Sequence, residues 1–185
     1  MHHRIDSKRI ALTALFTAAS LMASFIQIPI FPAAPWLMYD PSGIVCLIAG
    51  MAFGPKLGCA VAVISWIPRI LLDPIGAPMG ILSTCALVIP AALAYRARRT
   101  RAASIAGMAM GAVLSIAIAC AMNLVVTPLY TAVSVADVAA MIIPVLLPFN
   151  ALKMAINVAA GQVLLAPCLR VVDAGAPQAA ARSAR

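Results

Sequence analysis

The sequence predicts an all-α membrane protein with six transmembrane helices, and three observations support this fold class. First, 64% of the 185 residues are apolar and only 10% are charged, whereas soluble domains carry about 25% charged residues. Second, the mean hydropathy is +1.06. Third, apolar runs that approach the roughly 20 residues of a bilayer-spanning helix recur along the chain, separated by short connections that contain Pro, Gly or Arg.

Residues 9–28 form the first expected span. A signal peptide would be followed by a cleavage site of small residues and then by a soluble domain, but here further apolar runs follow. We therefore interpret this run as a retained helix. The second span, residues 42–54, is short, which leaves open a tilted span or a partly re-entrant segment. The other spans are expected at residues 56–72, 79–95, 103–126 and 141–169.

The distribution of charge predicts how these helices are oriented. Eleven of the thirteen basic residues lie at the termini or in the second and fourth connections, and basic connections face the cytoplasm. Both termini are therefore expected on the cytoplasmic side, and Asp40, Asp73 and Asp137 on the outer side. We expect residues 1–172 to form one membrane domain and residues 173–185 a disordered cytoplasmic tail. The eleven basic residues are Arg4, Lys8, Arg9, Lys56, Arg96, Arg98, Arg99, Arg101, Arg170, Arg182 and Arg185.

Several classes of protein require residues that this chain lacks. The only His residues are His2 and His3, and there is no Glu, so neither a Ser–His dyad within the membrane nor an H-E-x-x-H zinc site can form. The sequence contains no phosphate-binding loop of the type G-x-x-x-x-G-K-[ST]. The five Cys residues show no C-x-x-C spacing, so we expect no metal site and no disulfide framework. These absences disfavour an enzyme, and the clustering of basic residues as topology signals disfavours nucleic-acid binding.

A polar stripe interrupts the last apolar run. At 100° per residue, Asn150, Lys153 and Asn157 lie within an arc of about 60°, and Gly161 continues the stripe. A Lys near the centre of a bilayer costs about 3 kcal/mol on insertion scales, so such a residue usually has a function. The stripe therefore predicts a ligand-binding face in the outer half of the helix. The alternative is that Lys153 extends to the outer headgroups, or pairs with an Asp as a purely structural contact.

Two further features are expected near this stripe. Asn123 is the strongly polar residue of the run 103–126 and lies level with Asn150, although an interhelical hydrogen bond would also explain it. The first outer loop carries Trp36, Met38, Tyr39 and Asp40 between prolines, which suggests a lid over a pocket that opens outward. An aromatic belt at the membrane interface is the alternative for this loop. We expect one buried cation and no carboxylate within the membrane, so the pocket favours a neutral, flat-ringed, hydrogen-bonding ligand or a weak anion.

Small residues at four-residue spacing predict close helix contacts. Such pairs let helices approach, either within the bundle or against a partner's helices. The pairs are Ala14 and Ala18, Ala19 and Ala23, and Gly107 and Gly111.

Four motifs resemble those of the substrate-binding S components of energy-coupling factor vitamin transporters, and within them the riboflavin branch. "LLPFNALK" at 146–153 is similar to that branch's P-F-N-x-x-K, and "MNLVVTPLY" at 122–130 to its N-x-x-x-x-P-L-Y. "YDPSGIVCLIAGMAFGPKLG" at 39–58 resembles the start of the second helix and the F-G-P turn, and "GAPMG" at 76–80 the entry to the fourth helix. The resemblance extends from the first helix to about residue 170.

The resemblance implies a membrane subunit that binds riboflavin as a transported ligand, without cofactor or metal, and that performs no catalysis. It implies a coupling transmembrane subunit and two cytoplasmic ATPase subunits as partners, in the plasma membrane of a prokaryote. On the first helix, Ala14 and Ala18 are the implied contacts with the coupling subunit. The ligand-binding residues expected from the motifs, the stripe and the loop are Asn150, Lys153, Asn123, Tyr39, Asp40, Met79 and Asn157.

The sequence departs from the family pattern in the third and fourth helices. Arg69 stands at an unusual place in "SWIPRILL", and Thr84 occupies a position where Asn is frequent. These departures leave a second hypothesis open, the same fold with another vitamin or a heterocyclic precursor as ligand. A membrane scaffold in which Lys153 is only structural is the third hypothesis.

Overall fold

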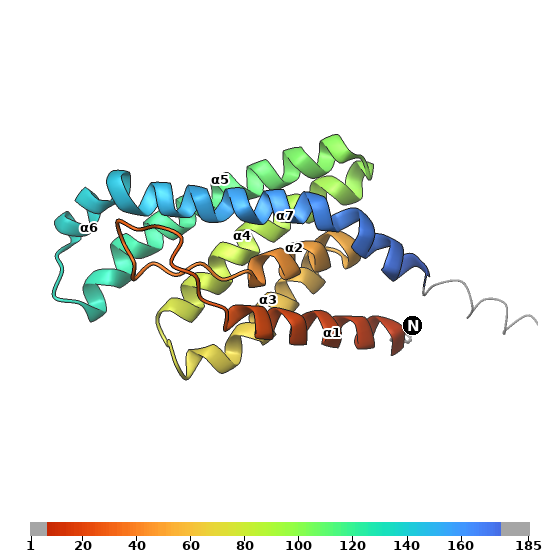
Figure 1. The fold of residues 1–185 in the computed structure, drawn as a ribbon, viewed down its shortest axis with the longest axis horizontal. Helices are drawn as coiled ribbons and strands as arrows, with labels where there is room; N and C mark the ends of the chain where they lie inside the picture. The colour runs from red at the N-terminus through yellow and green to blue at the C-terminus, as the bar shows by residue number, and fades with distance from the viewer. Residues whose placement is uncertain (1–6, 175–185) are drawn as a thin grey trace, which may run out of the picture.

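The computed structural model describes residues 7–174, and this part of the chain is helical apart from its connections. Helix α1 lies along one side of the bundle, packed on α2 and α3, while α5 and α7 lie together on the opposite side (Figure 1). Helix α4 packs against α2, α3 and α5. The helices are α1 (Ser7–Ser24), α2 (Ser42–Phe53), α3 (Pro55–Ile70), α4 (Gly76–Arg98), α5 (Arg101–Tyr130), α6 (Val135–Met141), the π-helix η1 (Ile142–Leu146) and α7 (Leu147–Ala174).

Each of the six predicted runs corresponds to a helix, but not every helix is long enough to be a span by itself. Three segments are long and apolar enough to cross a membrane, namely Gly76–Arg98, Arg101–Leu129 and Val135–Val172. Helices α1 and α2 contain shorter apolar stretches, Ile10–Ser24 and Ser42–Phe53. The short α2 agrees with the short second span predicted from the sequence. Helix α1 ends four residues before the predicted boundary at residue 28, because the chain turns into the first outer loop there.

The last helical segment begins at Val135, earlier than the predicted residue 141. Its start is fixed by a capping box, in which Ser134 Oγ accepts from the Asp137 backbone N–H at 3.2 Å and Asp137 Oδ2 accepts from the Ser134 N–H at 3.2 Å. The π-helical turn contains Pro144, which has no N–H to donate to the preceding turn. The predicted tail begins inside α7, which continues to Ala174; residues 175–185 lie outside the described part of the chain.

The segment expected as the first outer loop, residues 25–41, folds back on itself, and it keeps the name outer loop below. Ile28 and Tyr39 form an isolated antiparallel bridge, with N–H to carbonyl distances of 2.8 and 2.9 Å. This bridge brings Tyr39 and Asp40 into the bundle, where both residues are buried. Trp36 remains exposed. The loop therefore has a buried end beside α2 and an exposed tip.

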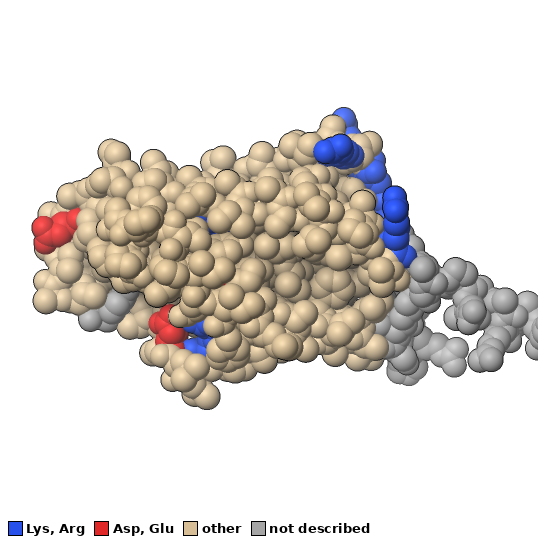
Figure 2. Space-filling view, in the orientation of Figure 1, with Lys and Arg blue, Asp and Glu red and all other residues tan. Residues whose placement is uncertain are grey.

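Charged side chains separate toward the two ends of the bundle. Figure 2 shows Lys and Arg gathered at the end where α1 begins and α7 ends, and acidic side chains toward the other end. The basic end includes Arg96 and Arg98 in the last turn of α4 and Arg101 at the start of α5. This separation is the spatial form of the charge pattern from which the sequence predicts cytoplasmic termini.

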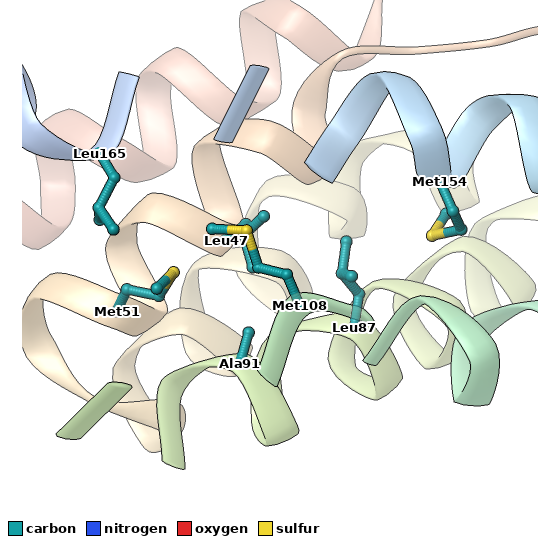
Figure 3. Packing of buried hydrophobic residues seen from close by; sticks show 7 residues of the cluster. All are labelled: Leu47, Met51, Leu87, Ala91, Met108, Met154 and Leu165. Carbon is teal, nitrogen blue, oxygen red and sulfur yellow. The ribbon is translucent and has the colours of Figure 1, made fainter. Parts of the chain in front are cut away.

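The core lies where α2, α4, α5 and α7 meet (Figure 3). Its members are Leu47, Met51, Leu87, Ala91, Met108, Met154 and Leu165. Gly161 of α7 faces this cluster, since a Cβ at that position would contact Leu47 Cδ2 at 2.8 Å and Met108 Cε at 3.4 Å. Flexible side-chain ends therefore surround Gly161.

A different kind of contact joins α2 to α3. Gly54 turns the chain between them with φ of 105°, a conformation that favours glycine. Beyond this turn, a Cβ at Gly58 would lie 2.5 Å from the Gly50 Cα. Backbone meets backbone at this point, so neither helix can make room by rotating a side chain.

This contrast predicts that Gly58→Ala and Gly161→Ala have opposite effects. Gly58→Ala is expected to destabilise the protein by about 1–3 kcal/mol, because the new methyl group forces two backbones apart. Gly161→Ala is expected to be neutral or stabilising, because alanine favours a helix by about 1 kcal/mol relative to glycine and its neighbours can shift. Thermal unfolding of the two variants in detergent measures the difference. Equal melting temperatures would contradict the inferred backbone contact.

Candidate functional site

A cavity of about 370 Å³ lies where α3 ends and α4 and α7 begin, at the end of the bundle opposite the basic end. The first outer loop covers it, and α3, α4, α5 and α7 supply its walls. Five of the seven residues predicted from the sequence line this cavity, although they come from three helices and the loop. These five are Asp40, Met79, Asn123, Asn150 and Lys153.

Lys153 of α7 forms an ion pair with Asp40 of the outer loop, with Nζ 3.2 Å from Oδ2. The two side chains are 19% and 8% exposed, so the pair is largely shielded from solvent. Asp40 Oδ1 also accepts hydrogen bonds from the backbone N–H and the hydroxyl of Ser42. The pairing with an Asp, which the sequence left as the structural alternative for Lys153, is therefore present, and both partners also line the cavity.

The cavity carries more charges than the sequence predicts. It is lined by two cations, Lys153 and Arg69, and by two carboxylates, Asp40 and Asp73. The sequence predicts one buried cation, Asp40 as a residue of the pocket and no carboxylate within the membrane, so Arg69 and Asp73 are the additions. The bridge between Ile28 and Tyr39 folds the loop inward and carries Asp40 into the bundle.

The carboxamides of Asn150 and Asn123 are held by their own helices. Asn150 Nδ2 donates to the Leu146 carbonyl at 2.8 Å, and Asn123 Nδ2 donates to the Ala119 carbonyl at 2.8 Å. The Thr127 hydroxyl donates to Asn123 Oδ1 at 3.2 Å. A carboxamide nitrogen carries two donor hydrogens, so each Asn can also donate to a molecule in the cavity. The π-helical turn directly precedes the helix that carries Asn150.

Tyr39 and Asn157, also predicted as ligand contacts, lie outside the cavity lining and bond to each other. The Tyr39 hydroxyl donates to Asn157 Oδ1 at 3.0 Å, and both residues are buried. Burial and the neighbouring Asp40 raise the pKa of Tyr39 to about 12, so the phenol remains a donor at neutral pH. A Cβ at Gly43 would lie 2.9 Å from Asn157 Nδ2, so the amide packs closely on α2. This bond is a second link between the outer loop and α7.

The cavity is also lined by a set of residues around Arg69 of α3 that were not predicted as site residues from the sequence. The Arg69 guanidinium donates to the Ser24 carbonyl at the end of α1 and lies over the Trp66 ring, 5.2 Å from the ring centroid. Gln27 also faces it; with the amide oxygen turned toward the guanidinium, Gln27 accepts from Nη2 at 2.5 Å. The signal in the sequence was an Arg within an apolar run, three residues after a Trp.

The entry to α4 is shaped by contacts with α3. Asp73 Oδ1 accepts from the Gly76 N–H at 2.7 Å, which holds the carboxylate at the start of α4. A Cβ at Gly80 would lie 2.7 Å from Trp66 Cη2, so the indole packs directly on the α4 backbone. A Cβ at Gly76 would overlap the Asp73 carboxylate, so close contacts account for both glycines of "GAPMG". Met79, which lies between them, lines the cavity. Thr84 is buried but does not line the cavity.

The arrangement of these groups suits the binding of a small polar molecule. Ammonium, guanidinium, carboxylate and amide groups alternate with the apolar faces of Trp36, Trp66, Met79 and Phe149, and a few polar groups in an apolar cavity fix a ligand's orientation. Among the described residues, no three His, Cys, Asp or Glu side chains lie close enough together to hold a metal ion. The arrangement therefore supports the binding of a small molecule.

The predicted docking residues lie on a different surface. Ala14 and Ala18 are exposed on α1, whereas Ser20 and Ser24 of the same helix are buried against the bundle. Ser20 Oγ donates to Ser65 Oγ of α3 at 3.0 Å. The face of α1 that carries the two alanines is therefore unoccupied by the described part of the chain.

Comparisons with known proteins agree on one family. The sequence model of "ECF transporter, substrate-specific component" matches residues 8–164. "Riboflavin transporter RibU" of Staphylococcus aureus (strain TCH60) is 27% identical over 157 residues, which cover 80% of this chain and 83% of that protein.

A solved structure described as "Structure and mechanism of the S component of a bacterial ECF transporter" superposes with a TM-score of 0.74. It is 26% identical in sequence, and the match covers 88% of this chain and 95% of that one. The family and these relatives are transporter components, not enzymes. The chain belongs to the substrate-specific S components of ECF transporters.

Proposed function

We propose that this S component binds riboflavin in the cavity beneath the outer loop and presents it for uptake driven by ATP hydrolysis. The observation that carries the proposal is the convergence of Asn123, Asn150 and Lys153 on one cavity. The similarity to a protein named as a riboflavin transporter supports the choice of ligand. A coupling transmembrane subunit and two cytoplasmic ATPase subunits complete the proposed transporter, because this sequence has no nucleotide-binding loop of its own.

The chemistry of a flavin suits the groups around the cavity. The polar edge of the tricyclic ring presents carbonyl oxygens and an N–H, which the carboxamides and the Lys153 ammonium can pair. The ring faces can pack on Met79 and the indole of Trp66. The hydroxylated side chain of the ligand requires polar partners, and the group around Arg69 and Asp73 provides them.

The same group favours a second candidate ligand. Arg69 is buried, departs from the family pattern and lines the cavity. A buried guanidinium pairs well with a carbonyl-rich or weakly anionic heterocycle. Another vitamin or heterocyclic precursor bound in the same fold is therefore the alternative to riboflavin.

The proposed orientation places the cavity at the outer side of the membrane. The chain is a membrane protein of a transporter family, and its basic end is the expected cytoplasmic side. Both termini are then cytoplasmic, in the plasma membrane of a prokaryote. The ligand enters from outside, beneath Trp36 and Met38 of the loop.

The first prediction from this proposal concerns the ligand itself. Protein purified in mild detergent is expected to be yellow and to show a flavin absorption spectrum, because a shielded cavity with paired polar groups releases its ligand slowly. Colourless protein that also leaves riboflavin fluorescence unquenched would reject riboflavin in favour of the alternative ligand.

The second prediction separates a ligand contact of Lys153 from its structural ion pair. Lys153→Met is expected to weaken riboflavin binding by about tenfold or more, as for a lost charge-assisted hydrogen bond. It should also lower the melting temperature, because Asp40 is left buried without its counter-charge. Adding Asp40→Asn removes that unpaired charge, so the double variant should recover stability without recovering affinity. Fluorescence titration and thermal unfolding measure the two effects.

Asp40→Asn alone is the matched control, since it leaves the ammonium in place. If the double variant binds riboflavin as tightly as Asp40→Asn does, Lys153 serves only to pair Asp40. That result would support the scaffold hypothesis for this residue.

The third prediction concerns the exposed face of α1, which we propose docks on the coupling subunit. Ala14→Trp and Ala18→Trp are expected to abolish riboflavin uptake by cells that carry the complete transporter, because a bulky side chain prevents close helix approach. Binding of riboflavin to the purified variants should stay unchanged, since neither residue lines the cavity. Ala117→Trp, at an exposed position of α5, is the control. Normal uptake by both α1 variants would exclude this surface from docking.

A further inference from the structure

A second cavity, of about 390 Å³, lies at the basic end of the bundle. It is formed where the end of α4, the start of α5 and the last turns of α7 meet. None of the residues that line it also lines the first cavity. The proposed riboflavin site therefore does not account for it.

The tight connection between α4 and α5 gives this cavity two guanidinium groups. Arg99 adopts the left-handed conformation with φ of 45°, and its N–H donates to the Tyr95 carbonyl at 2.7 Å, which ends α4. Thr100 then caps α5 by accepting from the Ala103 N–H at 3.2 Å. The reversal places Arg99 and Arg101 on the same cavity, with no acidic residue in its lining. Two arginines in a lining that contains no acidic side chain favour an anion, and the guanidinium fork fits phosphate oxygens.

The interior wall adds a polar group with hydrogen-bonding capacity. Gln162 Nε2 donates to Ser104 Oγ at 2.6 Å, and Ser104 is buried. Since the Ser104 oxygen is the acceptor in this bond, its hydroxyl hydrogen can be donated to another oxygen. Ser104 can thus support an anion held by the two arginines.

The remaining wall is apolar. Leu165, Ala166 and Leu169 of α7 line it, and Leu165 belongs to the core cluster. A free phosphate ion would leave this wall uncovered. A ligand that joins an anionic head to an apolar body satisfies both parts of the cavity.

We propose that this cavity binds an anionic phospholipid, with the phosphate on Arg99 and Arg101 and the glycerol and first methylenes against Leu165 and Leu169. The site lies where the membrane-spanning helices α4, α5 and α7 have their basic ends, which is the depth of the headgroup layer. Bound lipid holds the junction of these helices at the membrane surface. The inference is independent of which ligand occupies the first cavity.

Native mass spectrometry of the full-length protein tests this site. The protein is released from vesicles of equal parts phosphatidylglycerol and phosphatidylcholine, and retained lipid is counted. Wild type is expected to retain phosphatidylglycerol preferentially. Arg99→Gln with Arg101→Gln should reduce that retention by about tenfold or more, because basic residues near a membrane surface each add to the binding of anionic lipid. Ala166→Trp should reduce retention as well, by filling the apolar part without changing the charge.

Arg96→Gln with Arg98→Gln is the matched control, because it removes two arginines from the same end of the bundle without altering the lining of the cavity. Equal loss in this control would show that general charge, not the cavity, retains the lipid, and would overturn the proposal. So would unchanged retention by Ala166→Trp, or displacement of the lipid by excess glycerol phosphate, which has the head and no apolar chain. Unchanged binding of riboflavin, or of the identified alternative ligand, confirms that each variant is folded.

Discussion

The ion pair between Lys153 and Asp40 is the contact on which the end of the molecule opposite the basic end depends. An unpaired ammonium on α7 would be costly among apolar helices, and so would an unpaired carboxylate at the buried end of the loop. The pairing offsets the cost of burying each charge, and the Ser42 N–H donates to the other carboxylate oxygen of Asp40. The pair therefore ties a long irregular loop to a membrane helix. It also leaves both charged groups at the wall of a cavity, where a ligand can reach them.

The loop is held by more than one kind of bond, and this explains how an irregular segment can be buried. The bridge between Ile28 and Tyr39 pairs its backbone, and the Tyr39 hydroxyl donates to Asn157 outside the cavity lining. Buried polar groups require such partners, since each unsatisfied one costs about 1–3 kcal/mol. Arg69, on the α3 wall of the cavity, donates to the Ser24 carbonyl at the end of α1. The cavity is thus bordered by polar contacts between segments far apart in the sequence.

At the basic end of the molecule, backbone contacts and a tight turn, not buried ion pairs, determine how the helices pack. Gly50 and Gly58 bring α2 and α3 to backbone contact, while the left-handed Arg99 reverses the chain between α4 and α5. Where three helix ends meet, close packing is incomplete and the second cavity remains. The two cavities differ in electrostatic character, because the charged residues that line the first are of both signs and those that line the second are both arginines. This difference is the reason why a polar solute is proposed for the first cavity and an anion for the second.

The sequence by itself determined the helical class, the order of the helices and the polar face of the last one, because hydropathy and helical period are local properties. It also predicted Asn123, Asn150 and Lys153 as site residues, because polar residues stand out in apolar runs, and the structure places all three at one cavity. Only the tertiary structure decided the partner of Lys153 and the place of Arg69 in the cavity. Those contacts join residues that are distant in the chain, and they depend on how a loop without periodicity folds back. The sequence contains no periodic pattern from which the path of this loop could be predicted.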